Sequence, residues 1–241
     1  HTYYSDGAST VRELVKQAEK KGLSGFAITD HDTVKAHKHI KKFNKVIIIP
    51  GIEVTTKQGH VLGYLINESI PKELSVDEAI DRIHEQGGIA VAAHPFEMFR
   101  GYKDFMKHAF DAFELLNGYE PKNYVYKKLN KYTKKMPFTA GSDAHITESL
   151  GRCYIESPEV SDAEELIKNV LRRKVKAGGE LLTIKDYVLK LKLIEEKKLK
   201  NPRTSTVQKI VSKIIIETPA PILEIVNGLL TRAVNKFNAA R

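Results

Sequence analysis

Short apolar runs alternate with amphipathic stretches through the first 180 residues of the chain. The run from Ile89 to Ala93 contains no polar residue, a pattern that is typical of a strand buried on both faces. Similar runs predict strands at residues 24–29, 45–49, 61–66, 89–93, 112–116, 137–140 and 152–156. Runs this short cannot cross a bilayer, so we expect no transmembrane helix.

Three amphipathic stretches begin with a capping box, in which Ser or Thr is followed three residues later by Glu. The boxes are Thr10-x-x-Glu13, Ser75-x-x-Glu78 and Ser161-x-x-Glu164. We expect a helix after each box, and shorter polar helices at residues 34–42 and 122–134. Strands that alternate with helices in this way favour a parallel β/α architecture.

Residues 181–241 show helical stretches at 185–199, 206–217 and 221–237, with no strand pattern between them. The last stretch carries apolar residues at helical spacing: Ile222, Val226, Leu229, Ala233 and Phe237. Such a stripe usually packs against the body of a protein, and dimer contact or attachment to a membrane surface are the alternatives. We therefore expect a catalytic domain at residues 1–180 and a helical extension at residues 181–241, packed on or beside it.

Charge and cysteine content narrow the class of protein. The 241 residues include 39 Lys and Arg against 30 Asp and Glu, and the net charge of +9 favours anionic partners such as phosphates or nucleic acid. Cys153 is the only cysteine, which excludes an intramolecular disulfide and a thiolate zinc cluster. With no secretory signal pattern, we expect a cytoplasmic protein.

Five of the nine histidines stand at or just beyond the ends of predicted strands: His1, His31, His60, His94 and His145. Three carboxylates occupy matching positions: Asp6, Glu53 and Asp143. Neutral imidazole is a good ligand for zinc and iron, and carboxylate suits manganese. Together these side chains predict a polynuclear metal site. Because they converge from many strand ends, we favour a barrel with its site at the carboxyl ends of the strands over an open sheet.

These side chains lie in six short motifs: HTYYSDG at residues 1–7, ITDHD at 28–32, PGIE at 50–53, HVLGY at 60–64, AHP at 93–95 and GSDAH at 141–145. The motifs and their order resemble those of the PHP family, named for polymerase and histidinol phosphatase. The resemblance covers about residues 1–175 and implies a distorted seven-stranded β/α barrel with up to three metal ions at its C-terminal face. The chain resembles a short form, because it lacks the insertion between His60 and His94 of relatives that act on nucleoside bisphosphates.

The resemblance also implies how the ligands are shared among three ions. Glu53 bridges two of the ions, with His1 and Asp143 on one of them and His60 and His94 on the other. The third ion is held by Asp6, His31 and His145. The first motif of the family is His-x-His at the end of the first strand, and this chain begins at the second of those histidines. We therefore expect that the first strand and its ligand are missing from the chain.

We expect hydrolysis of a phosphoester by a hydroxide that bridges two metal ions, with Glu53, His31 and Asp143 at the catalytic centre. Three cations just beyond ligand motifs are candidates for binding the substrate phosphate, with a solvated surface role as the alternative: Arg152, Arg100 and Lys103. Asp30 and Asp32 flank His31, and we expect them to orient imidazoles or waters.

The expected cofactors are two or three divalent ions, since zinc, manganese and iron all accept mixed ligands of this kind. The expected partner is a small phosphorylated substrate, nucleotides included, with nucleic acid secondary and no membrane; the C-terminal helices offer the surface for a homo-oligomer. The alternative function is a non-catalytic, basic RNA-binding barrel subunit of a ribonucleoprotein, which would have no use for metal ligands. Metal-dependent amide hydrolysis on a barrel is the second enzymatic alternative.

Overall fold

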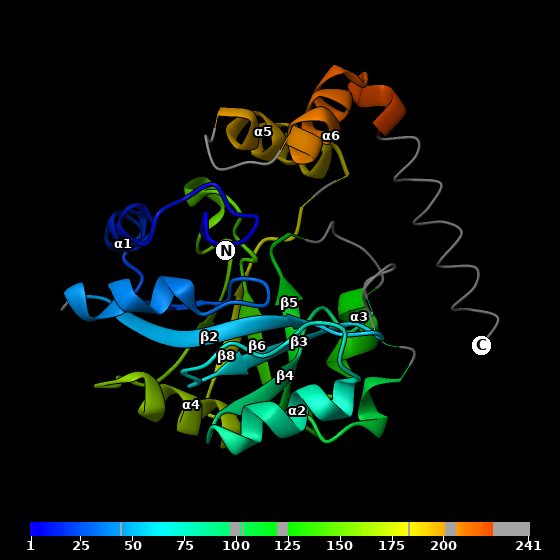
Figure 1. The fold of residues 1–241 in the computed structure, drawn as a ribbon. Helices are drawn as coiled ribbons and strands as arrows, with labels where there is room; N and C mark the ends of the chain where they lie inside the picture. Colours follow the sequence, from blue (N-terminus) through cyan, green and yellow to red (C-terminus); the bar gives the residue numbers. More distant parts are fainter. Residues whose placement is uncertain are drawn as a thin grey trace.

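The structure is a computed structural model that describes residues 1–43, 45–96, 102, 104–119, 125–182, 184–200 and 206–223. A curled six-stranded sheet forms its centre (Figure 1). The strands neighbour one another in chain order: β1 (Gly25–Ile28), β2 (Ile47–Thr55), β3 (His60–Tyr64), β4 (Ile89–Ala92), β5 (Ala112–Asn117) and β6 (Phe138–Gly141). The expected α/β class is confirmed, and the sheet curls into half of a barrel.

The sheet is mixed, because β3 runs antiparallel to both of its neighbours while the other strands pair in parallel. The expectation of a parallel sheet is wrong at this strand. Only residues 56–59 join β2 to β3, and a parallel connection needs a crossover of about a dozen residues or more. Thr56 closes the hairpin by donating its hydroxyl to the Gly59 carbonyl at 2.5 Å. As a consequence, β3 starts at the rim where its neighbours end.

A second sheet consists of two antiparallel strands, β7 (Cys153–Glu156) and β8 (Lys176–Gly179). The strand expected at residues 152–156 is confirmed as β7, which packs beside β6. The sequence does not predict β8, because a lysine, an alanine and two glycines lack the β-branched and aromatic residues typical of strands. Within the described residues, six strands therefore lie in the curled sheet and two lie beside it.

Helices surround the sheet: α1 (Val11–Lys20), α2 (Val76–Glu85), α3 (Val125–Asn130), α4 (Ala163–Leu171), α5 (Ile184–Lys200) and α6 (Thr206–Glu217), with 3-10 turns η1 (Lys35–Lys42), η2 (Phe105–Lys107) and η3 (Thr147–Ser149). The capping boxes that start at Thr10 and Ser75 are confirmed. The third is displaced by one residue, because Asp162 rather than Ser161 caps α4 and accepts the Glu165 amide at 2.8 Å. A carboxylate can take that role as well as a hydroxyl can.

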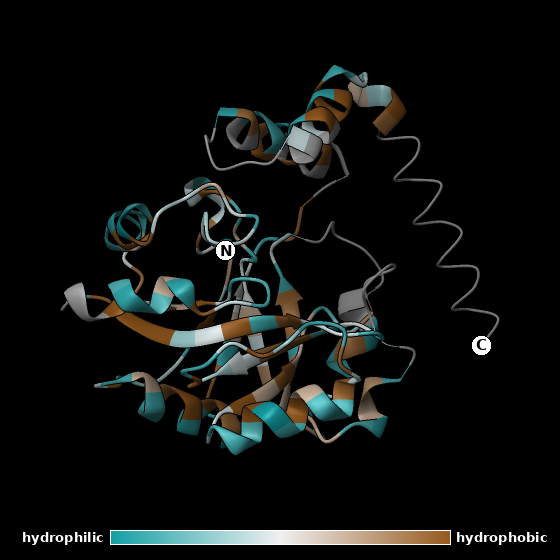
Figure 2. Cartoon of the chain, in the orientation of Figure 1, coloured by the Kyte–Doolittle hydropathy of each residue, from teal (hydrophilic) through white to brown (hydrophobic). Residues whose placement is uncertain are grey.

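The core lies between the sheet and the apolar faces of its helices. Figure 2 shows brown, hydrophobic strands and a teal, hydrophilic outer side on α2. The inner side of α2 is fully buried and packs in one cluster with Phe105 and Phe113. Each buried side chain of Ile or Phe size contributes about 1.5–3 kcal/mol. This packing fixes the strands and with them the rim.

Helices α5 and α6 pack against each other, and in Figure 1 they lie above the N-terminus and the sheet. Lys192 Nζ donates to the carbonyls of Ile216, at 2.9 Å, and Thr218, at 2.5 Å, and so caps the end of α6. The division at residue 180 stays a prediction, and most of the helix expected at residues 221–237 lies outside the described residues. None of the described helices is long and apolar enough to cross a membrane.

Candidate metal centre

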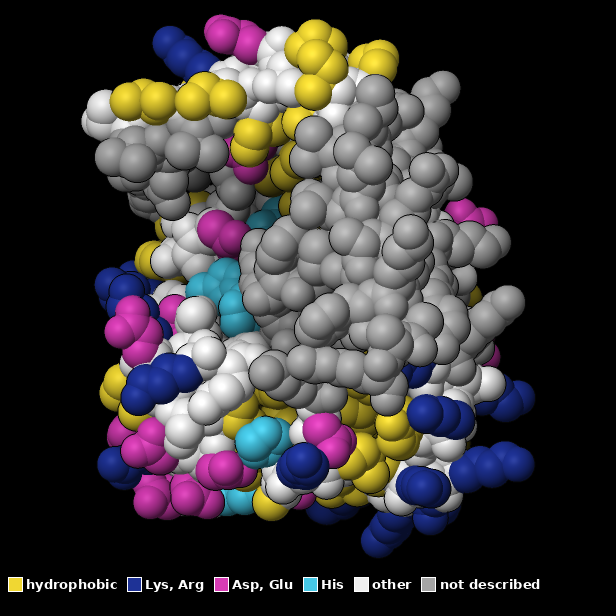
Figure 3. All heavy atoms as spheres, turned by 90° about the vertical axis from the view of Figure 1, so that its right-hand side faces the viewer, with side chains coloured by type: hydrophobic (Ala, Val, Ile, Leu, Met, Phe, Trp, Pro, Cys, Tyr) yellow, Lys and Arg dark blue, Asp and Glu magenta, His cyan; other side chains and the backbone are white. Residues whose placement is uncertain are grey.

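The eight side chains expected to bind metal meet at one rim of the curled sheet. Glu53 lies in β2, and His60 is the first residue of β3, which reaches this rim because β3 is antiparallel. The others come from the N-terminal loop and from the segments that follow β1, β4 and β6: His1, Asp6, His31, His94, Asp143 and His145. A group of histidine side chains is visible at the surface on one face of the molecule (Figure 3).

Glu53 is the centre of this cluster, and only 4% of the residue is exposed. Its Oε1 lies 2.7 Å from His60 Nδ1 and 3.2 Å from His94 Nε2. Its Oε2 lies 3.1 Å from His1 Nε2. The two oxygens therefore face different histidines, which is the arrangement expected of a carboxylate between two cations.

A second group surrounds His1. His1 Nε2 lies 3.0 Å from Asp143 Oδ1, and His145 Nδ1 lies 3.6 Å from the same oxygen. Asp6 Oδ1 lies 3.5 Å from His1 Nδ1, and Asp6 Oδ2 lies 3.1 Å from His145 Nε2. The geometry thus keeps Asp6 with His145, as the resemblance implies, and also joins His145 to Asp143.

Five imidazoles form a continuous row across the rim. The ring centroids are separated by 4.4 Å between His145 and His1, 4.7 Å between His1 and His31, 5.0 Å between His31 and His60, and 5.1 Å between His60 and His94. Five protonated rings at these distances would repel one another strongly. Neutral imidazoles interleaved with carboxylates are instead the donor set that zinc, iron and manganese accept.

The spacing of the donor atoms suits divalent ions. Two atoms bound tetrahedrally at about 2.1 Å lie roughly 3.4 Å apart, close to the separations of 3.0–3.6 Å around His1 and Asp143. His31 Nδ1 is buried without a hydrogen-bond partner among the described residues, as expected of a nitrogen that faces a cation. Burial lowers the pKa of His31 and so favours its neutral, metal-binding form. The residues present therefore fit divalent metal ions.

The buried carboxylates and imidazoles of the site shift one another's pKa values. Burial opposes ionisation of Glu53, but the surrounding histidines, His31 first, hold its pKa well below its ordinary range. Burial likewise opposes protonation of His94, yet its hydrogen bond with Glu53 and that carboxylate's charge raise the pKa of His94 to about 10. In the absence of metal, protons on imidazoles balance the buried carboxylates, and a binding ion has to displace them.

Two of the candidate ligands have left-handed backbone conformations, which cost about 1–3 kcal/mol each for residues other than glycine. The φ angles are 27° at His94 and 45° at Asp143. Both residues follow strands of the central sheet, at the points where the chain turns across the rim. Such strain persists only where neighbouring contacts hold the backbone in place.

Asp30 and Asp32 hold the segments that carry the ligands. Asp30 accepts hydrogen bonds from Thr2 N at 2.5 Å, from Thr2 Oγ1 at 2.6 Å and from Ser5 Oγ at 2.8 Å, which fixes the N-terminal loop. Asp32 Oδ1 accepts from the Thr55 amide at 2.7 Å, at the end of β2. These contacts are to backbone and hydroxyl groups, and the expected orientation of imidazoles or waters stays a prediction.

Of the three cations expected to bind phosphate, Arg152 is described, whereas Arg100 and Lys103 lie outside the described residues. Arg152 immediately precedes β7. A Cβ placed on Gly118 would lie 3.2 Å from Arg152 Cβ and 3.0 Å from Ser142 Cα, so Arg152 stands beside the ligand segment after β6. Its Nε is buried and has no hydrogen-bond partner in the described structure. Such a nitrogen is a donor available to an anion.

Sequence reasoning missed two buried polar residues in the apolar run of β5, Glu114 and Asn117. Glu114 accepts the His94 amide at 2.9 Å, and Asn117 donates to Asp143 at 3.2 Å. Burial raises the pKa of Glu114 to about 7. The signal that could have found them is a carboxylate inside an apolar strand, since charged residues are almost never fully buried without a partner.

A half-barrel whose rim gathers five histidines and three carboxylates has the architecture and donor set of a metal-dependent hydrolase. The PHP domain family matches residues 1–181, and the chain belongs to that family. It is thus a hydrolase acting on phosphoester bonds. An uncharacterized protein of Methanocaldococcus jannaschii is 36% identical over 140 residues, which cover 56% of this chain and 82% of the relative. A second protein of that organism is 32% identical over 174 residues, covering 64% of this chain and 70% of its own.

Solved structures share the fold at low sequence identity. Endonuclease Q of Pyrococcus furiosus matches 97% of this chain and 88% of its own length, with a TM-score of 0.60 and 16% identity. An amidohydrolase of Chromobacterium violaceum matches 73% of this chain and 95% of its own, with a TM-score of 0.56 and 16% identity. At this level of identity the likeness is one of fold.

Proposed function

We propose that the chain is a metal-dependent phosphoesterase that hydrolyses a phosphomonoester or a nucleotide-type substrate. The observation that carries the proposal is the position of Glu53, whose two oxygens face different histidines within a rim of eight donor groups. Two or three zinc, manganese or iron ions suit these donors. When bound, such ions lower the pKa of a coordinated water and polarise phosphoryl oxygens.

The side chains of the site are shared among these ions. Glu53, His31 and Asp143 form the catalytic centre in this proposal, with Glu53 as the shared ligand. The remaining ligands fall on either side of it: His60 and His94 near one oxygen, His1 near the other, and Asp6 and His145 beyond His1. Neutral imidazoles and ionised carboxylates are the forms that bind, so the site works best above the pH at which protons fill it.

Arg152 is assigned to the substrate phosphate. Its buried Nε has no hydrogen-bond partner among the described residues, and its side chain starts beside the segment that carries Asp143. The planar guanidinium can donate two parallel hydrogen bonds to phosphate oxygens. Arg152 would thereby hold the phosphate against the rim.

The likeness to endonuclease Q bears on the substrate class. That enzyme has been solved with a 27-mer duplex substrate carrying an abasic lesion, and the structure matches 100% of this chain with a TM-score of 0.59. The match runs beyond residue 181, where the family match ends. Together with the net charge of +9 it supports a nucleotide or nucleic-acid phosphoester.

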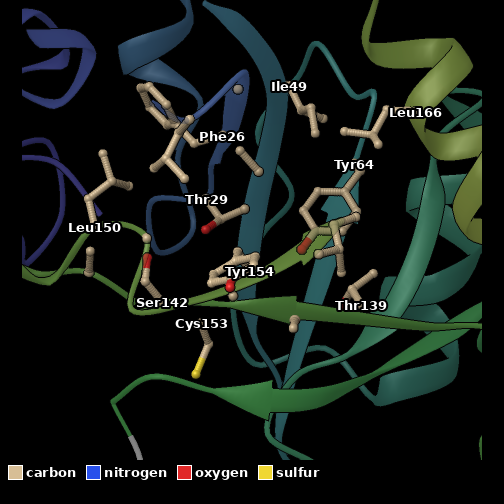
Figure 4. Close-up of a pocket in the computed structure, with 18 of the residues that line it drawn as sticks. Phe26, Thr29, Ile49, Tyr64, Thr139, Ser142, Leu150, Cys153, Tyr154 and Leu166 are labelled. Atoms are coloured by element: carbon tan, nitrogen blue, oxygen red, sulfur yellow. The ribbon is translucent and has the colours of Figure 1, made fainter. Parts of the chain in front are cut away.

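One further strand would complete the barrel. A cavity of about 910 Å³ lies between β1 and β7, and Figure 4 shows Phe26, Tyr154 and Leu166 among its lining side chains. In the described sheets β1 pairs only with β2, and β7 only with β8. We place one more strand in this cavity, along the open edge of β1. Hydrogen exchange tests this: β1 amides that face away from β2 should be protected if a further strand pairs with them, and should exchange rapidly if that edge is open.

The function is tested by elemental analysis of the purified protein and by hydrolysis of an aryl phosphate monoester and a diester. We expect bound divalent metal, and turnover that a chelator abolishes and Mn²⁺ or Zn²⁺ restores. Turnover that survives complete removal of metal would contradict the proposal. Metal-free, inactive protein whose RNA binding falls steeply with salt would instead favour the ribonucleoprotein alternative.

A further inference from the structure

Glu114 is a buried carboxylate that lies behind the metal centre rather than in it. It belongs to β5, and only 5% of the residue is exposed. Its Oε2 accepts two hydrogen bonds, from the His94 amide at 2.9 Å and from Asn117 Nδ2 at 3.0 Å. One carboxylate thus holds the backbone of a ligand and a second polar side chain.

Asn117 carries the connection on to another strand. Its Nδ2 also donates to Asp143 Oδ2 at 3.2 Å, and its Oδ1 accepts the Tyr119 amide at 2.8 Å. The other oxygen of Asp143, Oδ1, is the one that faces His1. Asn117 therefore holds the oxygen that points away from the ligand cluster and leaves the other one directed into it.

A break in the ladder of β5 makes this pair of contacts feasible. Side chains alternate between faces along a strand, so Glu114 and Asn117, three positions apart, would face opposite sides of a regular strand. The pairing of β5 with β6 shifts by one residue between Glu114 and Leu116. The extra residue returns Asn117 to the face of Glu114, and bulges of this kind re-aim side chains beside active sites.

Gly141 leaves space for the carboxylate. A Cβ at this position would come within 2.9 Å of Glu114 Oε1, closer than real Cβ contacts. The same residue ends β6, two positions before Asp143. The bulge, the glycine and the two hydrogen bonds therefore converge on one buried group.

The two ligands served by this pair are those with left-handed backbones, His94 and Asp143. Each comes from a different strand, and the geometry of each needs external contacts to persist. We propose that Glu114 and Asn117 are positioning residues that fix His94 and Asp143 for metal binding. The inference rests on the proposed function, because it concerns the metal ligands of that site.

The test compares Co²⁺ affinities of the purified, chelator-stripped protein, read from visible absorption and calorimetry. The variants are Glu114→Ala, Glu114→Gln and Asn117→Ala. Thr139→Val is the matched control, because Thr139 is buried and pairs with Glu114 across the β5–β6 ladder. Glutamine keeps one oxygen that can accept both hydrogen bonds, so Glu114→Gln reports on geometry without the charge.

We expect Glu114→Ala to weaken Co²⁺ binding by about 10–100-fold at the ion near His94 and at the ion near Asp143. This is the range found for groups that orient metal ligands. Asn117→Ala should weaken the binding of only the ion near Asp143. Glu114→Gln should recover most of the affinity lost in Glu114→Ala. If Glu114→Ala does not fold, the other two variants decide. Equal affinities in Glu114→Ala, Asn117→Ala and Thr139→Val would overturn the positioning role alone. Wild-type protein that binds no Co²⁺ would overturn the proposed function and this inference with it.

Discussion

Replacement of Glu53 tests the organisation of the whole site. Glutamine has nearly the same shape, but one carboxylate oxygen becomes an amide nitrogen, which donates hydrogen bonds and cannot bind a cation. In the structure one oxygen serves His60 and His94, and the other serves His1. Glu53→Gln therefore removes a ligand from at least one ion whichever way the amide is turned.

The expected magnitude follows from these contacts. Loss of a direct ligand exceeds the 10–100-fold effect of losing a group that only orients one, so one ion should bind at least about 100-fold more weakly. We expect turnover to fall by at least about 10³-fold, equivalent to about 4 kcal/mol of transition-state stabilisation. Glu53→Ala, which removes both oxygens, should abolish hydrolysis.

The fold should survive Glu53→Gln. Burial lowers the pKa of His94, and Glu53 is the main group that raises it to about 10, with Glu114 and Asp143 adding to the effect. Without the Glu53 carboxylate the pKa of His94 should fall, so the imidazole can release its proton rather than stay charged without that partner, which limits the loss of stability. Circular dichroism and thermal melting test this point, and Glu19→Gln on the exposed face of α1 is the control. Activity within tenfold of wild type, with unchanged metal content, would refute the bridging assignment.

Three further perturbations probe the surroundings of the site. In metal-free protein the Tm should fall as pH rises from 6.5. The contribution of protonated His94 to stability is complete below its ordinary pKa of 6.5 and is lost as pH approaches about 10. Added Mn²⁺ should raise the Tm more at higher pH, because fewer protons compete with it. Arg152→Ala should raise KM about tenfold or more in steady-state kinetics, and Arg152→Lys should recover only part of this. Asp30→Ala leaves the Thr2 amide without its acceptor and should lower the free energy of unfolding by about 1–3 kcal/mol in urea melts.

The local sequence pattern predicted most of the helices and strands. The direction of a strand depends instead on the length of the segments that connect it to its neighbours. The capping boxes at Thr10 and Ser75 placed α1 and α2 correctly, because a cap depends on residues within one turn. The parallel expectation failed at β3, although the short link at residues 56–59 could have predicted the hairpin. Strand β8 carries no pattern of its own, since its pairing with β7 depends on tertiary structure.

The candidate site divides in the same way. Its candidate ligands were recognisable because each stands at the end of an apolar run in a short motif. Glu114 and Asn117 were not, because their relation depends on a bulge that shifts the register of β5 against β6. The contacts of Asp30 with Thr2 and Ser5 were equally hidden, since they join segments that are distant in sequence.

The most direct test of the central claim is anomalous diffraction from crystals of the protein grown with Mn²⁺ or Zn²⁺. We expect two strong peaks on either side of the Glu53 carboxylate, about 3.5–4 Å apart as in other two-metal sites. One should lie by His60 and His94 and the other by His1 and Asp143. Metal-dependent hydrolysis in protein whose crystals show no anomalous peak at Glu53 would contradict the account.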